Sequence, residues 1–417
     1  MDVKVLRDYA KLIVKMGVNV QEGQEVVVNA SVHDAYFVEY VVEEAYKAGA
    51  KAVTVEWGFQ PTAKLAYQYQ TVETLCEMPE WKIKKQEYRV EKLPAMIHII
   101  SEDPDGMAGI DQAKMLQVQR TIGPIMMKYR MAMDNKYQWT IAGIPGVAWA
   151  KKIFPNLSEE EAMANLWDAI LKVTRVNGDP IKNWEEHNAN LAEKTNKLND
   201  LHIKTLKYKS ANGTDFTVDI QPELTFMAGG EYTLGGVFYN PNMPTEECFT
   251  SPDKHSANGV VMATKPLSVR GVLVDNFGFR FENGKVVEVI CDNPEHKDVL
   301  EKLVSTDEGA AMLGEVALVP FDSPINQTNL LFYNTLYDEN ACCHLAIGRA
   351  FTNCIKDYEK LSEEEIKAID LNTSMIHVDF MIGSADLSIV AETYDGKTVQ
   401  IFKDGTWLFN ESISYSF

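Results

Sequence analysis

Long apolar runs are missing from the 417-residue sequence. No stretch of about 18 apolar residues occurs, so we expect no transmembrane helix and no membrane partner. The first eight residues interleave charged and apolar side chains, whereas a secretory signal needs an uninterrupted apolar stretch after a basic start. The sequence therefore predicts a cytoplasmic protein.

Basic clusters and paired cysteines are also scarce. The formal net charge is -20, and no Lys/Arg cluster offers the basic face that binding to nucleic-acid phosphates requires, so we expect no nucleic-acid partner. The acidity indicates solubility, or a negative cleft that attracts cationic ligands, and the two are compatible.

The six cysteines contain no C-x-x-C pair, which predicts reduced, mostly buried thiols. Cys342 and Cys343 beside His344 suggest a zinc site, but adjacent cysteines rarely ligate one tetrahedral ion well, and core packing is the preferred interpretation.

Strand-like and helix-like segments alternate in the first part of the chain. Predicted strands cover residues 25–30, 51–57, 95–100 and 137–142, and predicted helices cover 34–48, 111–133 and 159–173. Ser158, with Glu161 three residues later, forms a capping box at the start of the last of these helices. This alternation predicts an α/β domain over residues 1–190, with a mostly parallel sheet and flanking helices.

The composition changes after about residue 190. A polar connecting helix is predicted over 188–201. Short strands separated by Gly, Asn and Pro turns follow over 205–208, 214–220, 260–263, 271–275, 286–290 and 375–382. A hairpin-type turn, Lys403-Asp404-Gly405, lies within the last segment, 398–407, and Ser362 with Glu365 forms a second capping box. The pattern predicts a β-rich α+β catalytic domain over residues 191–417.

Two carboxylate motifs stand out in this second half. Pro244 and Pro252 bound a loop that presents the adjacent carboxylates of Glu246 and Glu247. Further along, Glu315 stands in the otherwise apolar strand of Leu-Gly-Glu-Val-Ala-Leu-Val-Pro. A buried, unpaired carboxylate costs several kcal/mol, so Glu315 requires a cation, hydrogen bonds or a proton, unless it reaches solvent at a strand end.

Two histidine motifs follow. In residues 333–348, Asp338 is expected to cap a short helix whose second turn carries His344, so that Glu339 and His344 can converge on one point, although a lone histidine on such a helix is more often a satisfied core residue. In His-Val-Asp, His377 and Asp379 project from the same face of a predicted strand. Side chains two apart on a strand can serve one metal site, although a simple hydrogen-bonded pair is equally compatible with this spacing.

The co-occurrence of these groups is more specific than any one of them. Two histidines with three or four carboxylates suit a pair of divalent ions roughly 3.5–4 Å apart. Several carboxylates packed together would repel one another without cations between them. Mixed oxygen and nitrogen ligands suit Zn, Mn and Co alike.

Four motifs give the sequence a resemblance to a known family. N-M-P-T-E-E-C-F-T-S-P, L-G-E-V-A-L-V-P, L-Y-D-E-N-A-C-C-H-L-A-I-G and H-V-D-F-M-I-G-S resemble, in this order, motifs of the metallopeptidases that include aminopeptidase T, aminopeptidase S and PepS. The resemblance covers the whole chain. It implies that the metal ligands are Glu247, Glu315 as a bridging group, His344, His377 and Asp379, with Glu339 as a further candidate.

The resemblance also implies an activity. The expected protein is a cytoplasmic, homodimeric aminopeptidase that removes N-terminal amino acids from peptides with a free N-terminus. Two divalent ions (Zn, Co or Mn) activate a water, and Glu315 or Glu339 transfers the proton to the leaving amine.

One residue departs from the family pattern. Seven residues after the histidine of the third motif, where the family commonly has a tyrosine, this chain has Phe351, whose ring cannot donate a hydrogen bond. Loss of one oxyanion donor costs roughly 10²–10³ in rate, unless Tyr333 or Tyr337 substitutes for it. Two alternatives therefore stay open: a metal-dependent amidohydrolase acting on a non-peptide amide, and a metal-binding homologue with weak or lost activity.

Overall fold

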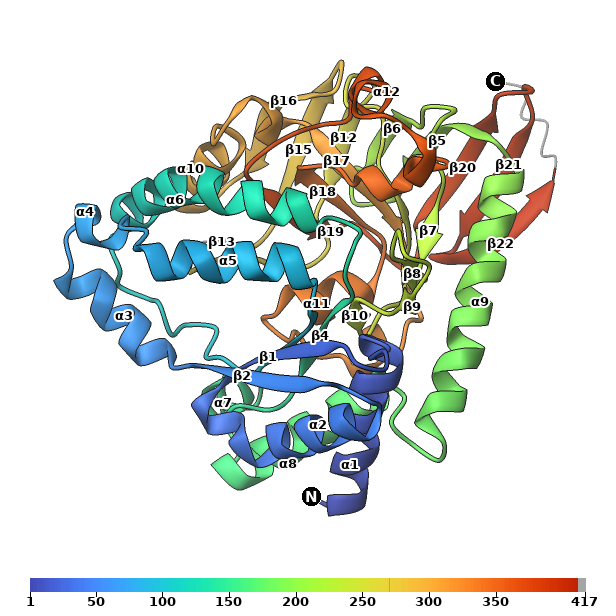
Figure 1. Cartoon of the computed structure of the whole chain (residues 1–417). Helices are drawn as coiled ribbons and strands as arrows, with labels where there is room; N and C mark the ends of the chain where they lie inside the picture. The colour runs from blue at the N-terminus through green and yellow to red at the C-terminus, as the bar shows by residue number, and fades with distance from the viewer. Residues whose placement is uncertain (270, 412–417) are drawn as a thin grey trace. The chain divides into compact units, whose positions relative to one another are not determined.

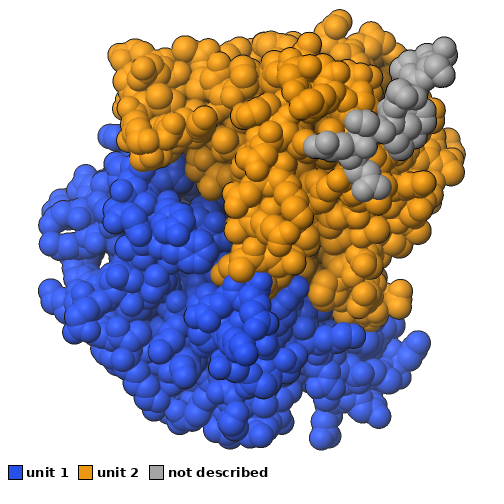
Figure 2. Space-filling model, turned by 90° about the vertical axis from the view of Figure 1, so that its right-hand side faces the viewer, with its two compact units in different colours: residues 1–186, 230–244 blue, residues 187–229, 245–417 orange. Residues whose placement is uncertain are grey.

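A computed structural model describes residues 1–269 and 271–411 of the chain. These residues form two compact units (Figure 2). Unit 1 comprises residues 1–186 and 230–244, and unit 2 comprises 187–229 with the chain from 245 onward. Because the chain leaves unit 1 and re-enters it, each unit contains two separate segments. The predicted domains, 1–190 and 191–417, stay a prediction.

Unit 1 is built on a parallel five-stranded sheet in the order β10-β4-β3-β1-β2 (Figure 1). Every neighbouring pair in this sheet runs parallel. The strands are β1 (Glu25–Ser31), β2 (Ala52–Gly58), β3 (Ala95–Ile100), β4 (Trp139–Gly143) and β10 (Asn242–Met243). Consecutive apolar residues make β1 and β3 buried central strands, as expected in a sheet covered by helices. The α/β character predicted for the N-terminal part is confirmed.

Helices connect these strands. They are α1 (Val3–Leu12), α2 (Ala35–Lys47), α3 (Gln60–Tyr69), α4 (Val72–Leu75), α5 (Glu80–Lys92), α6 (Gln112–Met133), α7 (Val147–Ile153) and α8 (Glu159–Val173). The capping box at Ser158 is present, since its hydroxyl accepts the amide of Glu161 while the Glu161 carboxylate accepts the amide of Ser158. Among the helices of residues 1–269 and 271–411, none is both long enough and apolar enough to cross a membrane.

Unit 2 contains two larger antiparallel sheets. The five-stranded sheet has the order β19-β18-β17-β11-β7, and the eight-stranded sheet has the order β16-β15-β12-β6-β5-β20-β21-β22. The first comprises β7 (Met227–Ala228), β11 (Cys248–Thr250), β17 (Leu313–Leu318), β18 (His344–Gly348) and β19 (His377–Met381). The second comprises β5 (Ile203–Lys209), β6 (Asp215–Asp219), β12 (Asn258–Met262), β15 (Phe277–Glu282), β16 (Lys285–Cys291), β20 (Ser388–Thr393), β21 (Thr398–Lys403) and β22 (Thr406–Glu411). The predicted β-rich C-terminal part is confirmed.

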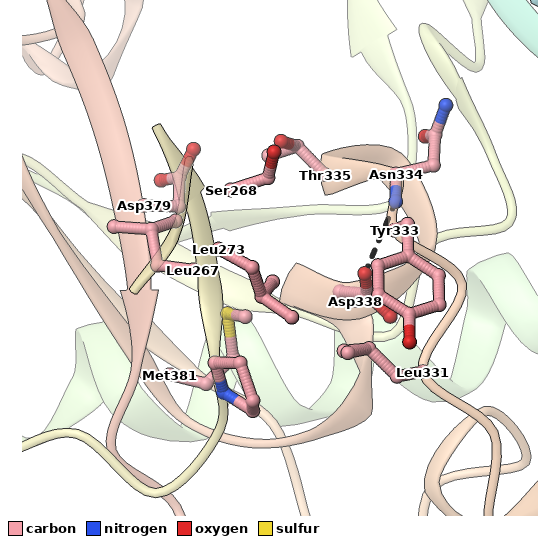
Figure 3. A pocket seen from close by; sticks show the side chains of 11 residues that line it. Leu267, Ser268, Leu273, Leu331, Tyr333, Asn334, Thr335, Asp338, Asp379 and Met381 are labelled. Atoms are coloured by element: carbon pink, nitrogen blue, oxygen red, sulfur yellow. Dashed lines mark hydrogen bonds between the residues drawn. The ribbon is translucent and has the colours of Figure 1, made fainter. Parts of the chain in front are cut away.

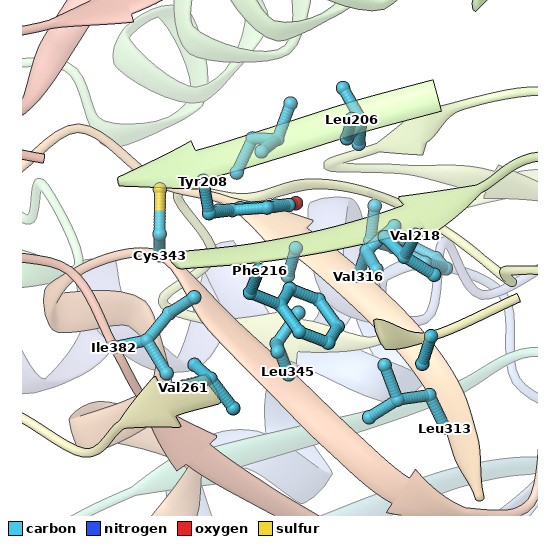
Figure 4. Close-up of a cluster of buried hydrophobic side chains, with 14 of the residues drawn as sticks. Leu206, Tyr208, Phe216, Val218, Val261, Leu313, Val316, Cys343, Leu345 and Ile382 are labelled. Atoms are coloured by element: carbon cyan, nitrogen blue, oxygen red, sulfur yellow. The ribbon is translucent and has the colours of Figure 1, made fainter. Parts of the chain in front are cut away.

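Both sheets of unit 2 contribute to one hydrophobic core (Figure 4). Tyr208 and Phe216 come from the eight-stranded sheet, and Val316, Leu345 and Phe380 come from the five-stranded sheet. Because side chains alternate along a strand, the residues next to Val316, Leu345 and Phe380 on their own strands project from the opposite face of the five-stranded sheet. Four of the six cysteines are buried and all six are free thiols, as the sequence predicts.

Helices complete unit 2. They include most of α9 (Pro180–Asp200), whose residues 180–186 belong to unit 1, together with α10 (Pro294–Val304), α11 (Thr335–Asp338) and α12 (Glu363–Ala368). The sequence placed the first of these helices at 188–201, and it begins earlier. The capping box of Ser362 with Glu365 is present at the start of α12. A separate two-stranded hairpin is formed by β13 (Leu267–Val269) and β14 (Val272–Val274).

The predicted helix carrying His344 is wrong. Asn334, not Asp338, caps α11 by accepting the amide of Leu336, and the chain becomes extended at Cys342. His344 then begins strand β18, which pairs on both sides and is buried along its whole length. Because both neighbouring strands supply hydrogen-bond partners for the backbone, tertiary pairing outweighs the short-range helix signals.

Candidate metal centre

The register of the five-stranded sheet brings four of the predicted site residues together. Glu315 on β17 lies opposite Ala346 on β18, and Ala346 lies opposite Asp379 on β19. His344 is two residues from Ala346, and His377 is two residues from Asp379, so both share this face. This face of the sheet therefore presents two carboxylates and two imidazoles around the methyl group of Ala346.

A β-bulge aims Glu315 at this face. The pairing of β17 with β18 shifts register between Leu313 and Glu315, which leaves Gly314 as the extra residue. A Cβ atom at Gly314 would stand 2.4 Å from the carbonyl oxygen of Gly348 and 2.3 Å from that of Arg349, so no larger side chain fits. The glycine of the L-G-E motif is therefore required by close backbone approach.

Glu247 reaches the same face from the next strand. It immediately precedes β11, whose Phe249 pairs with Ala317 on β17. Two residues before Phe249, the Glu247 side chain projects in the same direction as Phe249, Ala317 and Glu315. The motif of adjacent carboxylates thus supplies one side chain, that of Glu247, to the face that carries Glu315, although Glu247 lies 68 residues or more before the other ligand candidates in the sequence.

A buried hydrogen-bond network holds the loop that carries Glu247. The amide of Glu246 donates to the side-chain oxygen of Asn340 at 2.7 Å, and the Asn340 side-chain NH₂ donates to the Leu336 carbonyl at 2.9 Å. On the other side, Nε2 of His187 lies 2.7 Å from the carbonyl oxygen of Thr245. Neither Asn340 nor His187 was among the site residues predicted from the sequence. Asn340 stands between Asp338-Glu339 and His344 in the third motif, and this position was the one feature of the sequence that could have drawn attention to it.

The ligand atoms fall into two overlapping groups. Glu247, Glu315 and His344 form one, Glu315, His377 and Asp379 form the other, and within each group the atoms lie within 4.8 Å of one another. His344 Nε2 is 3.2 Å from a Glu247 oxygen. His377 Nε2 is 3.1 Å from a Glu315 oxygen and 3.3 Å from Asp379 Oδ1. Glu315 is the member common to both groups.

Backbone carbonyls orient both imidazoles. His377 Nδ1 lies 2.7 Å from the carbonyl oxygen of Arg349, and His344 Nδ1 lies 3.3 Å from that of Cys342. Since a carbonyl can only accept, Nδ1 must carry the proton and Nε2 faces the carboxylates. A metal-ligating histidine typically donates its second N–H in this way.

Charge and burial shift the pKa values of the carboxylates and imidazoles in these two groups. Burial, with repulsion from Glu247 and Asp379, raises the pKa of Glu315 to about 7. Burial also disfavours the Asp379 carboxylate, but the adjacent His377 outweighs this and lowers the pKa of Asp379 to about 2. Although burial alone lowers an imidazole pKa, nearby carboxylates raise the pKa of His344 and His377 well above the usual value.

Glu339 lies beside the two groups and belongs to neither. It begins the short 3-10 turn Glu339–Ala341 that follows α11, and its side chain is half-buried. Burial, with repulsion from Asp379 and Glu247, raises the pKa of Glu339 well above its usual value. Glu339 therefore favours its protonated form more strongly than an exposed glutamate does.

Divalent cations fit this donor set. Oδ1 of Asp379 is buried and makes no hydrogen bond, with His377 Nε2 3.3 Å away, so a cation can complete its coordination. Three buried carboxylates share one small region, an arrangement that cations stabilise. Ala317 and Ala346, which lie on the same face, carry only methyl side chains.

Phe351 packs against one side of the group. Its ring centroid lies 4.8 Å from that of His377 and 5.6 Å from that of Phe249. The phenyl ring offers no donor here, as expected from the sequence, but it supports the His377 ring by van der Waals contact.

Comparison with known proteins identifies the family. The family described as thermophilic metalloprotease (M29) matches residues 3–407. The chain belongs to the M29 metalloprotease family. The resemblance proposed from the four motifs is thus confirmed, and with it the predicted class, a metallopeptidase hydrolase. Membership implies that divalent metal binding is a property of this chain.

Relatives of the M29 chain extend over nearly its full length. Aminopeptidase AmpS of Bacillus subtilis (strain 168) is 46% identical over 97% of this chain and 98% of its own length. Aminopeptidase 2 of Geobacillus stearothermophilus is 41% identical, again over 97% and 98%. The solved structure of wild-type AmpT from Thermus thermophilus superposes with a TM-score of 0.88 at 35% identity, covering 97% of this chain and 99% of that one.

A more distant structure shares the fold alone. 2,5-Dihydroxypyridine dioxygenase from Pseudomonas putida KT2440 has a TM-score of 0.54 at 12% identity, covering 97% of each chain. At this identity the likeness describes the course of the backbone and says nothing about chemistry.

Metal binding to the M29 chain is expected to release protons. In the metal-free protein the raised pKa values keep His344 and His377 protonated near neutral pH, and Glu315, with a pKa of about 7, is partly protonated. Because a ligand must be deprotonated to bind a metal, affinity should rise with pH and fall as the pH drops from 8 to 6. Calorimetric titration in two buffers of different ionisation enthalpy measures the protons released.

The exposed His255 provides the control. A His255→Gln variant should release the same number of protons as the unchanged protein. An affinity that is independent of pH over this range, without proton release, would contradict the expectation.

Proposed function

We propose that this chain is an aminopeptidase that works with two divalent ions. Glu247, Glu315 and His344 would hold one ion, and Glu315, His377 and Asp379 the other. The observation that carries this proposal is the sharing of Glu315 by two groups of potential ligand atoms. A carboxylate common to two such groups supports a pair of ions, since it has two oxygens to offer as ligands.

Bound divalent ions would acidify a water and polarise the scissile carbonyl group. The residues around the ligands would orient the ligand side chains for that chemistry. Arg349 and Cys342 fix the imidazoles through their carbonyl oxygens, and the carboxylates supply the negative charge that balances the cations. Phe351 restricts the space available to the ring of His377.

Glu339 is the residue we propose for proton transfer. It lies outside both ligand groups, and its pKa is raised well above the usual value, so it keeps its proton to a higher pH than an exposed glutamate does. A general acid with these properties can donate to the leaving amine of a peptide. Glu315 has the weaker claim to this role, because its carboxylate is paired with His377 at 3.1 Å.

The proposed substrates are peptides with a free N-terminus. The relatives named above are aminopeptidases, and the acidic surroundings of the centre favour a cationic α-amine. Zinc, cobalt and manganese all suit the oxygen and nitrogen donors. We also propose a homodimer, supported by exposed aromatic side chains in unit 1, of which Tyr69 is 84% and Trp81 64% exposed. The cytoplasmic location predicted from the sequence stays a proposal.

Hydrolysis of aminoacyl anilides after chelation tests the proposal. The chelated protein should lose activity on leucine and alanine anilides, and re-addition of Co²⁺, Mn²⁺ or Zn²⁺ should restore it, because the chain offers the ligands and the ions supply the chemistry. N-acetyl-leucine anilide, which has no free α-amine, is the matched control and should not be cleaved.

Two outcomes would contradict it. Full activity of the metal-free protein would mean that the metal centre takes no part in the reaction. Equal cleavage of the acetylated anilide and of simple amides would favour the amidohydrolase alternative.

A further inference from the structure

Hollows of very different size occur in unit 2. The hollow that Asp379 lines has a volume of about 30 Å³, which is room for about two water molecules (Figure 3). Another hollow, at the junction of α9 and β5, has a volume of about 380 Å³, which suits a small organic ligand. We call it the α9–β5 hollow. Its described lining residues include no member of the two ligand groups of the metal centre.

Apolar side chains form the floor of the α9–β5 hollow. They come from the end of α9, the start of β5 and the segment that follows β6, and they are Leu198, Ile203, Ile220, Leu224 and Phe226. All five belong to the hydrophobic core of unit 2 and are at most 8% exposed. Because the edge of the core itself forms this floor, close packing fixes its position.

Hydrogen bonds hold the walls of the hollow in place. The Asn199 side chain accepts the amide of Phe226 at 2.7 Å and donates to the Phe226 carbonyl oxygen at 3.0 Å, which ties the end of α9 to the segment that follows β6. The Tyr394 hydroxyl donates to the carbonyl oxygen of Ile220 at 2.8 Å. These polar groups of the wall therefore bind the protein itself, and the hollow is formed before any ligand arrives.

Two opposite charges stand at the rim of the hollow. Asp200 is the last residue of α9, Lys356 follows the β-bridge between Leu224 and Ile355, and both are exposed. Within residues 1–269 and 271–411, neither charged side chain forms a hydrogen bond or an ion pair. The rim thus offers one carboxylate and one ammonium group above an apolar floor.

The side of the rim that carries Asp200 is acidic. The amide of Tyr394 donates to the carbonyl oxygen of His202, two residues after Asp200, at 3.0 Å. Partial burial raises the pKa of Tyr394, and so does repulsion from three nearby carboxylates, those of Asp219, Glu223 and Asp253. A cationic group is therefore favoured on this side, whereas Lys356 favours an anionic group.

We infer that the α9–β5 hollow binds a free amino acid with a large apolar side chain. The α-ammonium group faces Asp200, the α-carboxylate faces Lys356, and the side chain covers the apolar floor. A ligand with only one of these charges leaves Asp200 or Lys356 without a partner. A free amino acid is the product of the proposed aminopeptidase reaction, so the inference rests on the proposed function for the source of its ligand.

Calorimetric titration of the metal-loaded protein with phenylalanine and its analogues tests the inference. Lys356→Gln should weaken the binding of phenylalanine about fivefold, as expected for an exposed ion pair, and should leave phenylalaninol, which has no carboxylate, unchanged. Asp200→Asn should weaken phenylalanine to a similar extent and leave N-acetylphenylalanine, which has no ammonium group, unchanged. Any binding at the metal centre is the same in all of these proteins and cancels from the comparison.

Glycine and Lys367→Gln provide the controls. Glycine has no side chain to cover the floor, so its binding should not depend on Lys356. Lys367 is exposed on α12 and does not line the hollow, so Lys367→Gln should bind phenylalanine as the unsubstituted protein does. Metal content and melting temperature of every variant establish that the centre and the fold are intact.

Two results would overturn the inference. If Lys356→Gln weakened phenylalanine and phenylalaninol equally, the lysine would not face the carboxylate. If neither Lys356→Gln nor Asp200→Asn changed the binding of phenylalanine, the hollow would not hold the amino acid. The titrations need no turnover, so a protein that cleaves no anilide with any metal would overturn the proposed function and leave the binding result as measured.

Discussion

Glu315→Gln should abolish most of the activity and reduce the metal content. Glu315 is the side chain common to both ligand groups, so its neutral amide weakens both sites at once. Lost charge stabilisation of several kcal/mol, at about 1.4 kcal/mol for each factor of ten, corresponds to about a 1,000-fold fall in kcat/KM. Anilide kinetics together with elemental analysis measure both effects.

The same substitution should not destabilise the metal-free protein. The pKa of Glu315 is raised to about 7, above its unfolded value, so the ionised carboxylate opposes folding at pH 8. Glutamine has the same shape and no charge, and it can still contact His377. Thermal melting of the chelated proteins at pH 8 should therefore place the variant at or above the unsubstituted protein.

Glu308→Gln is the control for this experiment. Glu308 is exposed in the 3-10 turn before β17, so its variant should keep both metals and full activity. If Glu315→Gln itself kept metal and activity, the bridging assignment would be wrong.

Ala346→Leu should block the centre without removing any ligand. Ala346 lies directly between Glu315 and Asp379 in the sheet register, and its side chain is a single methyl group. A leucine there would project between the side chains that we propose as ligands. We expect loss of metal binding and a fall in kcat/KM of about 100-fold or more, since misplacement by 1 Å can cost 10²-fold.

The neighbouring core position distinguishes obstruction from instability. Ile347 projects from the other face of β18 into the hydrophobic core, and Ile347→Val should cost about 0.5–1.5 kcal/mol of stability. Ile347→Val should keep its metals although it melts earlier, whereas Ala346→Leu should lose them. Retention of two metals by Ala346→Leu, measured by elemental analysis, would mean that the ions do not lie over this strand.

Much of the fold follows from local patterns. The strand at residues 95–100 and the helix at 159–173 are observed within the predicted bounds, because an apolar run and a capping box are local signals. The pairing of β10 with β4 could not be predicted in this way, since two residues from 242–243 join a sheet whose other strands end at residue 143. So short a strand carries no periodicity.

The sequence identified the candidate ligand residues but not their arrangement in space. His377 and Asp379 follow from strand alternation alone, because they are two apart. The place of His344 does not, since its local sequence favours a helix and only pairing with β17 and β19 makes it a strand. Asn340 was missed because its role depends on Glu246, which is 94 residues away in the chain.

By itself the sequence determined which side chains are candidates for the metal site, since acidic and imidazole groups in a setting otherwise rich in apolar residues are stabilised there by a cation. Only the tertiary structure decided how they meet. The register of four antiparallel strands, with a bulge at Gly314, places side chains from 247 to 379 on one face. Register depends on hydrogen bonds between distant segments, and a shift of one residue would turn each of these side chains toward the core.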